Sequence, residues 1–139
     1  MNYNSMSVKL LNIKDVKIIK ALGGPIKPII SNDTTSKNQD FAMGVFKPKD
    51  GLYPHTHVNS EEIYFVLEGG GTVFVGKEKK SIKISEGDVV YIPAGMIHGV
   101  TNTGRRKLLI AFFVSPGKQH PGFSIGKDCV VFEEKILRP

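Results

Sequence analysis

From Phe41 onward, short apolar runs alternate with turn-forming residues, and this pattern restricts the fold to β-structure. The turns are rich in glycine and proline, as in Gly69-Gly70-Gly71 and Pro93-Ala94-Gly95. Short strands with regularly spaced turns are typical of a β-sandwich or barrel. The predicted strands cover residues 41–46, 62–67, 72–75, 81–84, 89–92, 98–101, 108–114 and 130–132.

The 139 residues are expected to form a single domain. We place its β-barrel at residues 41–135 and assign residues 1–40, with short strands or a helix and a loop, to the same domain. A helix is expected over 15–22, because Asp15 can cap its start and Gly23-Gly24 can end it. The polar stretch 31–40 is predicted to be a surface loop.

The expected location of the protein follows from three features that are not found in the sequence: a disulfide, a membrane-spanning segment and a signal peptide. Its one cysteine, Cys129, allows no disulfide within the chain, which fits a reducing compartment. The longest apolar run, residues 108–114, is far shorter than the ~20 residues of a membrane-spanning helix. Lysines interrupt the N-terminal segment, so no signal peptide is expected. We therefore expect a cytoplasmic protein with no membrane partner.

The formal charge of +6 comes from scattered basic residues. The densest groups, 77–80 and 105–107, lie beside glycines where turns are expected, and aromatic residues are not interleaved with them. We therefore expect no nucleic-acid partner. The run 63–67 is apolar at every position, which indicates a strand that packs on both faces. This strand is the reason to expect a homodimer.

Three of the four histidines fall in two groups. His55 and His57 are two residues apart, so a strand would place both imidazoles on one face, about 7 Å apart along the chain. Glu62 can return beside them on the next strand, and His98 follows the turn at Pro93. Three imidazoles and one carboxylate suit one divalent transition metal per chain, such as iron, manganese, nickel, copper or zinc.

These residues resemble the cupin superfamily. Its first motif, G-x5-H-x-H-x(3,4)-E-x6-G, is matched by residues 55–69, with Glu62 rather than Glu61 spaced correctly from Gly69. The leading glycine, Gly51, lies two residues too close to His55. Residues 87–102 match the second motif, G-x5-P-x-G-x2-H-x3-N, at every fixed position. The resemblance implies a small double-stranded β-barrel of the jelly-roll type, with the metal inside near one mouth and Asn102 in a structural role.

Four protein ligands leave two positions open on a six-coordinate metal, for water, dioxygen or a chelating substrate. By strand alternation, Tyr53 shares a face with His55 and His57, and Tyr64 shares one with Glu62. Either hydroxyl could donate to a bound oxyanion. Alternatively, Tyr64 is a core aromatic residue and Tyr53 a residue of the rim.

The three arginines lie in predicted turns or the tail, which argues against phosphorylated and dicarboxylate substrates. A pocket lined from 41–46 and 108–114 would instead take a small, largely apolar chelator, such as a diketone or a catechol-like compound. We expect a metal-dependent enzyme, with dioxygenase chemistry ahead of isomerase, lyase or decarboxylase chemistry. The alternative is a binding protein without turnover. His120 could belong to a lid over the mouth or to a surface loop.

Overall fold

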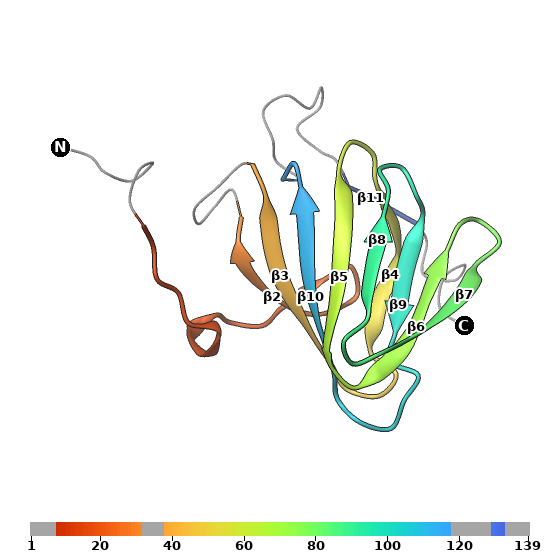
Figure 1. Ribbon diagram of the computed structural model, residues 1–139, viewed down its shortest axis with the longest axis horizontal. Coiled ribbons are helices and arrows are strands. Elements are labelled where there is room, and N and C mark those ends of the chain that lie inside the picture. The colour runs from red at the N-terminus through yellow and green to blue at the C-terminus, as the bar shows by residue number, and fades with distance from the viewer. Residues whose placement is uncertain (1–7, 32–37, 118–128, 133–139) are drawn as a thin grey trace.

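The computed structural model describes residues 8–31, 38–117 and 129–132 (Figure 1). Within these ranges one short 3-10 turn, η1 (Ile13–Asp15), precedes eleven strands. The strands are β1 (Ile19–Ala21), β2 (Gly24–Ile30), β3 (Asp40–Phe46), β4 (Gly51–His57), β5 (Glu61–Glu68), β6 (Gly70–Val75), β7 (Lys80–Ser85), β8 (Val89–Ile92), β9 (His98–Thr101), β10 (Leu108–Ser115) and β11 (Cys129–Val131). No helix in the described ranges is long and apolar enough to cross a membrane.

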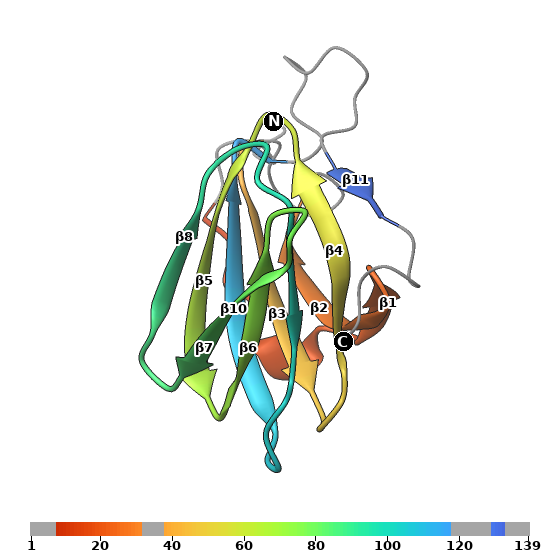
Figure 2. The same cartoon turned by 90° about the vertical axis from the view of Figure 1, so that its right-hand side faces the viewer.

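The strands form two antiparallel sheets, as expected for a double-stranded β-barrel. The first sheet has the order β1-β2-β3-β10-β5-β8 and the second has the order β11-β4-β9-β6-β7. From β3 to β6 the chain changes sheet with each strand, so neighbours in a sheet are distant in sequence. Figure 1 shows β10, in blue, between β3 and β5, and Figure 2 shows β4 and β11 side by side. The fold predicted from the sequence is therefore confirmed.

Both sheets contribute to one apolar core. In β5 the even-numbered residues from Glu62 to Val66 are buried, whereas their odd-numbered neighbours are exposed. The most deeply buried apolar side chains are Phe46, Tyr64, Val66, Val73, Val100, Leu108 and Ile110. Burying one such side chain contributes about 1.5–3 kcal/mol. A core of this kind stabilises the barrel without a disulfide.

The helix predicted over 15–22 is wrong, because η1 ends at Asp15 and the chain continues into β1. Val16 and Ile19 are β-branched and favour extended backbone over helix. Leu22 and Gly23 have φ angles of 52° and 82°, and Ala21 pairs directly with Gly24. Two central residues with positive φ form the tight turn of a β-hairpin. The glycine thus ends a strand rather than a helix.

The β1–β2 hairpin packs against β4 through its turn. The backbone amide of Tyr53 donates to the carbonyl of Leu22 over 2.8 Å. A Cβ atom on Gly23 would lie 2.3 Å from the Tyr53 ring, so only glycine fits beneath this ring. Most of the loop predicted over 31–40 lies outside the described residues, as does His120.

Asn102 fixes the turn after β9. Its Nδ2 donates to the carbonyls of Phe46 and Arg106 over 3.0 and 2.8 Å, and its Oδ1 accepts from the amide of Gly104 over 3.0 Å. Asn102 is 1% exposed, and its bond to the carbonyl of Phe46 is buried. The structural role expected for Asn102 is confirmed.

Candidate metal centre

Four buried side chains meet near one end of the barrel. His55 and His57 lie on β4, His98 begins β9, and Glu62 lies on β5. Their ligand atoms are all within 4.8 Å of one another, and none of the four residues is more than 5% exposed. Because β5 belongs to the first sheet and β4 and β9 to the second, the cluster joins the two sheets. The structure brings together the four residues that the sequence predicted as ligands.

Strand pairing explains why the imidazoles converge. His55 lies directly opposite His98 in the β4–β9 pair, and their ring centroids are 4.2 Å apart. His57 is two residues further along β4, and its ring lies 5.0 Å from that of His55. Residues directly opposite in a ladder, and residues two apart on a strand, share a face. Glu62 reaches the same point from the facing sheet.

Backbone carbonyls orient two of the imidazoles. Nδ1 of His55 donates to the carbonyl of Tyr53 over 2.7 Å, and Nδ1 of His98 donates to the carbonyl of Met96 over 2.9 Å. In each case the acceptor lies two residues earlier in the chain. A neutral imidazole that donates through Nδ1 presents the lone pair of Nε2, which is the form that binds a metal. The local backbone therefore prepares both rings as ligands.

The Glu62 carboxylate lies at the centre of the cluster. Its Oε1 is 2.8 Å from Nε2 of His98 and 3.1 Å from Nε2 of His57. Burial disfavours the charged carboxylate, but hydrogen bonds from His57 and His98 outweigh this effect and hold the pKa of Glu62 below its ordinary value. Burial lowers the pKa of His55 to about 3, with the neighbouring charge of His98 acting in the same direction. His55 is thus neutral at pH 7 and could offer its Nε2 lone pair to a metal.

The donor set fits a divalent transition metal. Nδ1 of His98 donates to the Met96 carbonyl, so without a second ring proton the 2.8 Å contact would bring the Nε2 lone pair against a carboxylate oxygen of Glu62. Two such acceptors are stable at this distance only with a cation between them, either a second proton on the ring or a metal ion. Three imidazole nitrogens and one carboxylate oxygen are ligands suited to the metals between manganese and zinc.

A family comparison agrees with this geometry. The model of the cupin domain matches residues 42–121, which is more than half of the chain and includes all four cluster residues. The chain belongs to the cupin family. The cluster occupies the two cupin motifs that the sequence resembles, at His55, His57 and Glu62 in the first and at His98 in the second.

Two similar proteins align with most of the length of this cupin. An uncharacterized protein of Methanocaldococcus jannaschii is 32% identical over 117 residues, which cover 76% of this chain and 92% of that protein. An uncharacterized protein of Aquifex aeolicus is also 32% identical, over 124 residues that cover 87% and 93%.

Solved structures show the same fold at low sequence identity. The polyketide cyclase RemF of Streptomyces resistomycificus has a TM-score of 0.70 and 18% identity, and the match covers 94% of this chain and 90% of that one. A predicted oxalate decarboxylase of Thermotoga maritima has a TM-score of 0.69 and 21% identity, over 78% and 99%. Proteins with different named activities therefore share this barrel.

A cavity of about 240 Å³ lies against the cluster of this cupin. As expected from the sequence, β3 and β10 contribute to its wall. Its lining consists of three cluster residues, one further carboxylate, one thiol and apolar side chains: His55, His57, Glu62, Asp40, Cys129, Ala21, Leu22, Ile26, Ala42, Leu52, Phe112 and Val114. No arginine or lysine lines it among the described residues.

Tyr53 does not line this cavity, contrary to the expectation that it faces the metal with His55 and His57. The pairing of β4 with β9 shifts register between Leu52 and His55, so strict alternation fails at Tyr53. Leu52 lines the cavity instead, and the Tyr53 ring covers Gly23.

Tyr64 lies beneath the cluster on the same face of β5 as Glu62. It is fully buried, and its ring centroid is 5.8 Å from that of His98. Its hydroxyl has no hydrogen-bond partner among the described residues. Burial raises the pKa of Tyr64 well above its ordinary value, and the charge of Glu62 adds to this effect, so the phenol keeps its proton. A protonated hydroxyl close to the cluster is an available donor.

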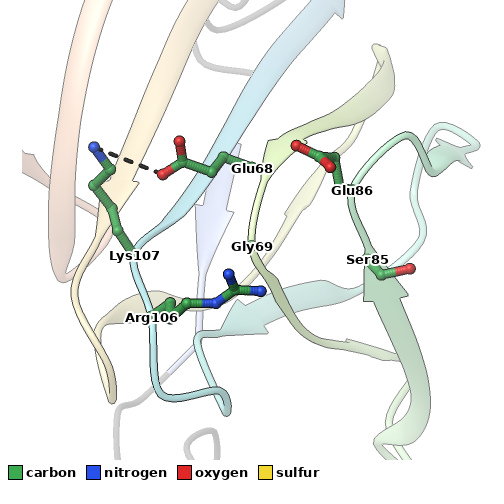
Figure 3. Close-up of a pocket in the computed structure, with 6 residues that line it drawn as sticks. All are labelled: Glu68, Gly69, Ser85, Glu86, Arg106 and Lys107. Carbon is green, nitrogen blue, oxygen red and sulfur yellow. Dashed lines mark ion pairs between the residues drawn. The ribbon is translucent and has the colours of Figure 1, made fainter.

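Basic side chains gather elsewhere, around a depression between β5, β7 and the loop before β10. Figure 3 shows Arg106 and Lys107 there beside Glu68 and Glu86. Nζ of Lys107 lies 3.7 Å from Oε2 of Glu68, and both side chains are about half exposed. A solvated ion pair of this kind contributes little to stability. In Figure 3 the one ion pair drawn joins Lys107 and Glu68.

Sequence reasoning missed Asp40 as a residue of the cavity. It ends a polar stretch that the sequence assigned to a surface loop, whereas the structure places it as the first residue of β3. The signal that could have found it is strand alternation, because Asp40 has the same parity as Ala42, which also lines the cavity.

Proposed function

We propose that this cupin is a metal-dependent enzyme that acts on a small, largely apolar chelating molecule, with dioxygenase-type chemistry. The observation that carries the proposal is the apolar cavity of about 240 Å³ that lies against four buried metal-binding groups. A cavity of ~150 Å³ holds benzene, so this one has room for a single ring with a few substituents. Its size and its wall support a compact substrate.

The residues of the site have different roles in the proposed reaction. A divalent transition metal bound by the four side chains would supply Lewis acidity and a common platform for oxygen and substrate. His55 and His98 are held in place by backbone carbonyls, so the ligand set is formed before substrate arrives. Leu52, Phe112 and Val114 exclude water from the reacting atoms. Tyr64 does not line the cavity, and its protonated hydroxyl lies in the core beside the cluster.

The wall of the cavity supports a neutral chelator over a phosphorylated or dicarboxylate substrate. Such anions are usually bound by an arginine fork or a lysine. Arg105 and Arg106 lie in the exposed loop before β10, away from the cavity lining. Diketones and catechol-like compounds need no cationic partner beyond the metal and match the apolar wall.

A metal-dependent isomerase or lyase is the second candidate. RemF, a polyketide cyclase, shares this barrel over 94% of the present chain, so non-oxidative chemistry is compatible with the same architecture. The two candidates differ in one measurable way, because only the dioxygenase consumes oxygen with its substrate. A protein that only binds these compounds would neither consume oxygen with them nor convert them to a product.

Element analysis and an oxygen electrode test the proposal. The purified protein should carry close to one transition metal per chain, and His57→Ala should lose most of it. Thr56→Val, between the two β4 ligands, is the matched control and should keep the metal. Iron-loaded protein should consume oxygen with 2,4-pentanedione or catechol derivatives. Wild-type protein that binds no added iron, manganese, nickel, copper or zinc would contradict the metal site, and a silent oxygen screen would contradict dioxygenase chemistry.

We also propose that two copies of this cupin associate through the outer face of the first sheet. Five neighbouring side chains on β5, β8 and β10 are between 37% and 63% exposed: Ile63, Phe65, Val89, Tyr91 and Phe113. Strand pairing places Ile63 opposite both Tyr91 and Phe113, and Phe65 opposite Val89, so they form one continuous patch. A patch of this kind marks an interface, and two identical apolar patches can pair about a two-fold axis, with Glu61 bound to Tyr91 at the edge of each.

Light scattering tests the dimer directly. The wild-type protein should have twice the mass of one chain, and Phe65→Glu should shift it to the monomer without loss of metal. The matched control is Ile82→Glu on the second sheet, where Ile82 is 39% exposed and the dimer should persist. A monomeric wild type at micromolar concentration would contradict this interface.

A further inference from the structure

A second buried carboxylate faces the cavity, outside the metal-binding cluster. Asp40 is 7% exposed and lines the same cavity as His57 and Glu62. Apart from the cluster residues and Cys129, the other lining residues are all apolar. Asp40 already interacts within the protein, and a carboxylate has about four lone-pair sites, so it can accept a further donor from the cavity. The metal centre itself does not use this group.

Strand register gives the position of Asp40 relative to the cluster. Val114 of β10 lies directly opposite Asp40 on one side and directly opposite Glu62 on the other. Directly opposite residues project from the same face, so all three side chains point into the barrel. Adjacent strands are about 4.8 Å apart, which puts the backbones of Asp40 and Glu62 roughly 10 Å apart. The cavity therefore has a metal-binding end and an acidic end, with Val114 between them.

We propose that Asp40 is a specificity-determining residue that accepts a hydrogen bond from a hydroxyl or protonated amine of the substrate. The inference rests on the proposed function, because the chelating atoms of the same molecule would occupy the metal end. The substrate class is then narrower than an apolar chelator: it carries a hydrogen-bond donor at the end remote from its chelating oxygens. A carboxylate at that end is repelled by Asp40.

Three catechols that differ in one substituent test the inference by isothermal titration of the zinc-loaded, full-length protein. The probes are 4-methylcatechol, 3,4-dihydroxybenzylamine and 3,4-dihydroxybenzoate. The wild type should bind the amine about tenfold more tightly than the methyl compound, a factor at the low end for a hydrogen bond between charged groups. It should bind the benzoate most weakly. Zinc keeps the readout independent of turnover.

Asp40→Asn should reduce the tenfold preference to within twofold and improve benzoate binding, while 4-methylcatechol binds as in the wild type. A purely structural role for Asp40 would instead weaken all three probes together, which would overturn the inference. Glu86→Gln, which removes one negative charge from an exposed loop, is the matched control and should keep the wild-type order. Asp40→Ser provides a second variant should the asparagine form fail to fold.

Binding of the three catechols to the wild type is enough to distinguish a failure of the Asp40 role from a failure of the proposed function. Equal binding of all three catechols would overturn the role of Asp40 and leave the proposed function intact, because the ring oxygens would still bind the metal end. No binding of any catechol to the loaded protein would overturn the chelating substrate and the inference that rests on it.

Discussion

Protonation of His55 should make the metal-free protein unstable in acid well before its carboxylates titrate. Burial lowers the pKa of His55 from 6.5 to about 3, so the unfolded chain takes up a proton near pH 6.5 that the folded chain excludes. The unfolded state then binds more protons, and the free energy of unfolding falls as the pH falls. This loss begins near pH 6.5 and ends only near the folded pKa of about 3.

The magnitude follows from the two pKa values. Between pH 7 and pH 5, one histidine with an unfolded pKa of 6.5 costs about 2 kcal/mol. This figure hardly changes for any folded pKa below 4, because the folded ring is neutral throughout the interval. Glu62 also has a lowered pKa and acts in the same direction, but its contribution is lost only below its ordinary value of 4.5. The interval from pH 7 to pH 5 therefore isolates His55 from Glu62.

Urea unfolding with a chelator present measures this effect. The free energy of unfolding is determined by circular dichroism at pH 7 and pH 5 for the wild type and for His55→Asn. The wild type should lose about 2 kcal/mol more than the variant over this interval. An equal loss in both proteins would refute the reasoning. So would a His55 ring resonance that titrates above pH 5 in the folded protein.

Four further substitutions test the packing of the barrel by urea unfolding. Tyr64→Phe removes a buried hydroxyl without a partner among the described residues, so stability should stay unchanged or rise by up to about 1 kcal/mol, and a clear loss would contradict this. Asn102→Ala removes one buried and two partly buried hydrogen bonds and should cost about 2–4 kcal/mol; a cost below ~1 kcal/mol would show that they matter little. Gly51→Ala places a Cβ 2.1 Å from the carbonyl oxygen of Val100. In Gly76→Ala the new Cβ meets nothing within 4 Å, so the only penalty is the ~1–2 kcal/mol of a left-handed backbone at a residue with a side chain. Gly51→Ala should therefore lower the free energy of unfolding by more than Gly76→Ala. Equal costs would contradict the close approach of β4 to β9.

Most of the barrel is predictable because its strands carry their own local signals. The strands at 89–92 and 98–101 have the bounds expected from the sequence, and β10 extends its predicted range by one residue. Short strands were among the elements expected within residues 1–40, but β2 was not located there, and Pro25 and Pro28 argue against a strand at its position. The structure nevertheless pairs both prolines, with Lys20 and Ala42. The hairpin at residue 22 was missed because Leu22 adopts a positive φ that its residue type disfavours.

The metal cluster was predictable because ligand spacing is a property of the sequence, whereas the cavity wall depends on long-range pairing. His55 and His57 share a face through simple alternation, and Glu62 and His98 follow from the motif spacing. Alternation failed for Tyr53, because a register shift in β4 cannot be seen without its partner strand. Asp40 was missed because the polar stretch 31–40 was assigned to a loop, so strand alternation was not applied to its last residue.

The two ends of the cavity have separate origins in the fold, and this separation determines how its chemistry can vary. The metal end is fixed by β4, β5 and β9 across both sheets, so a change there removes the ligands and loosens the contact between the sheets. Asp40 and Val114 stand on β3 and β10, strands that supply no ligand. Substitutions on these two strands can change which molecule fits while the metal site stays intact. We therefore predict that substitutions on β3 and β10 of the first sheet alter substrate choice, and that substitutions on β4 and β9 of the second sheet mainly alter metal binding.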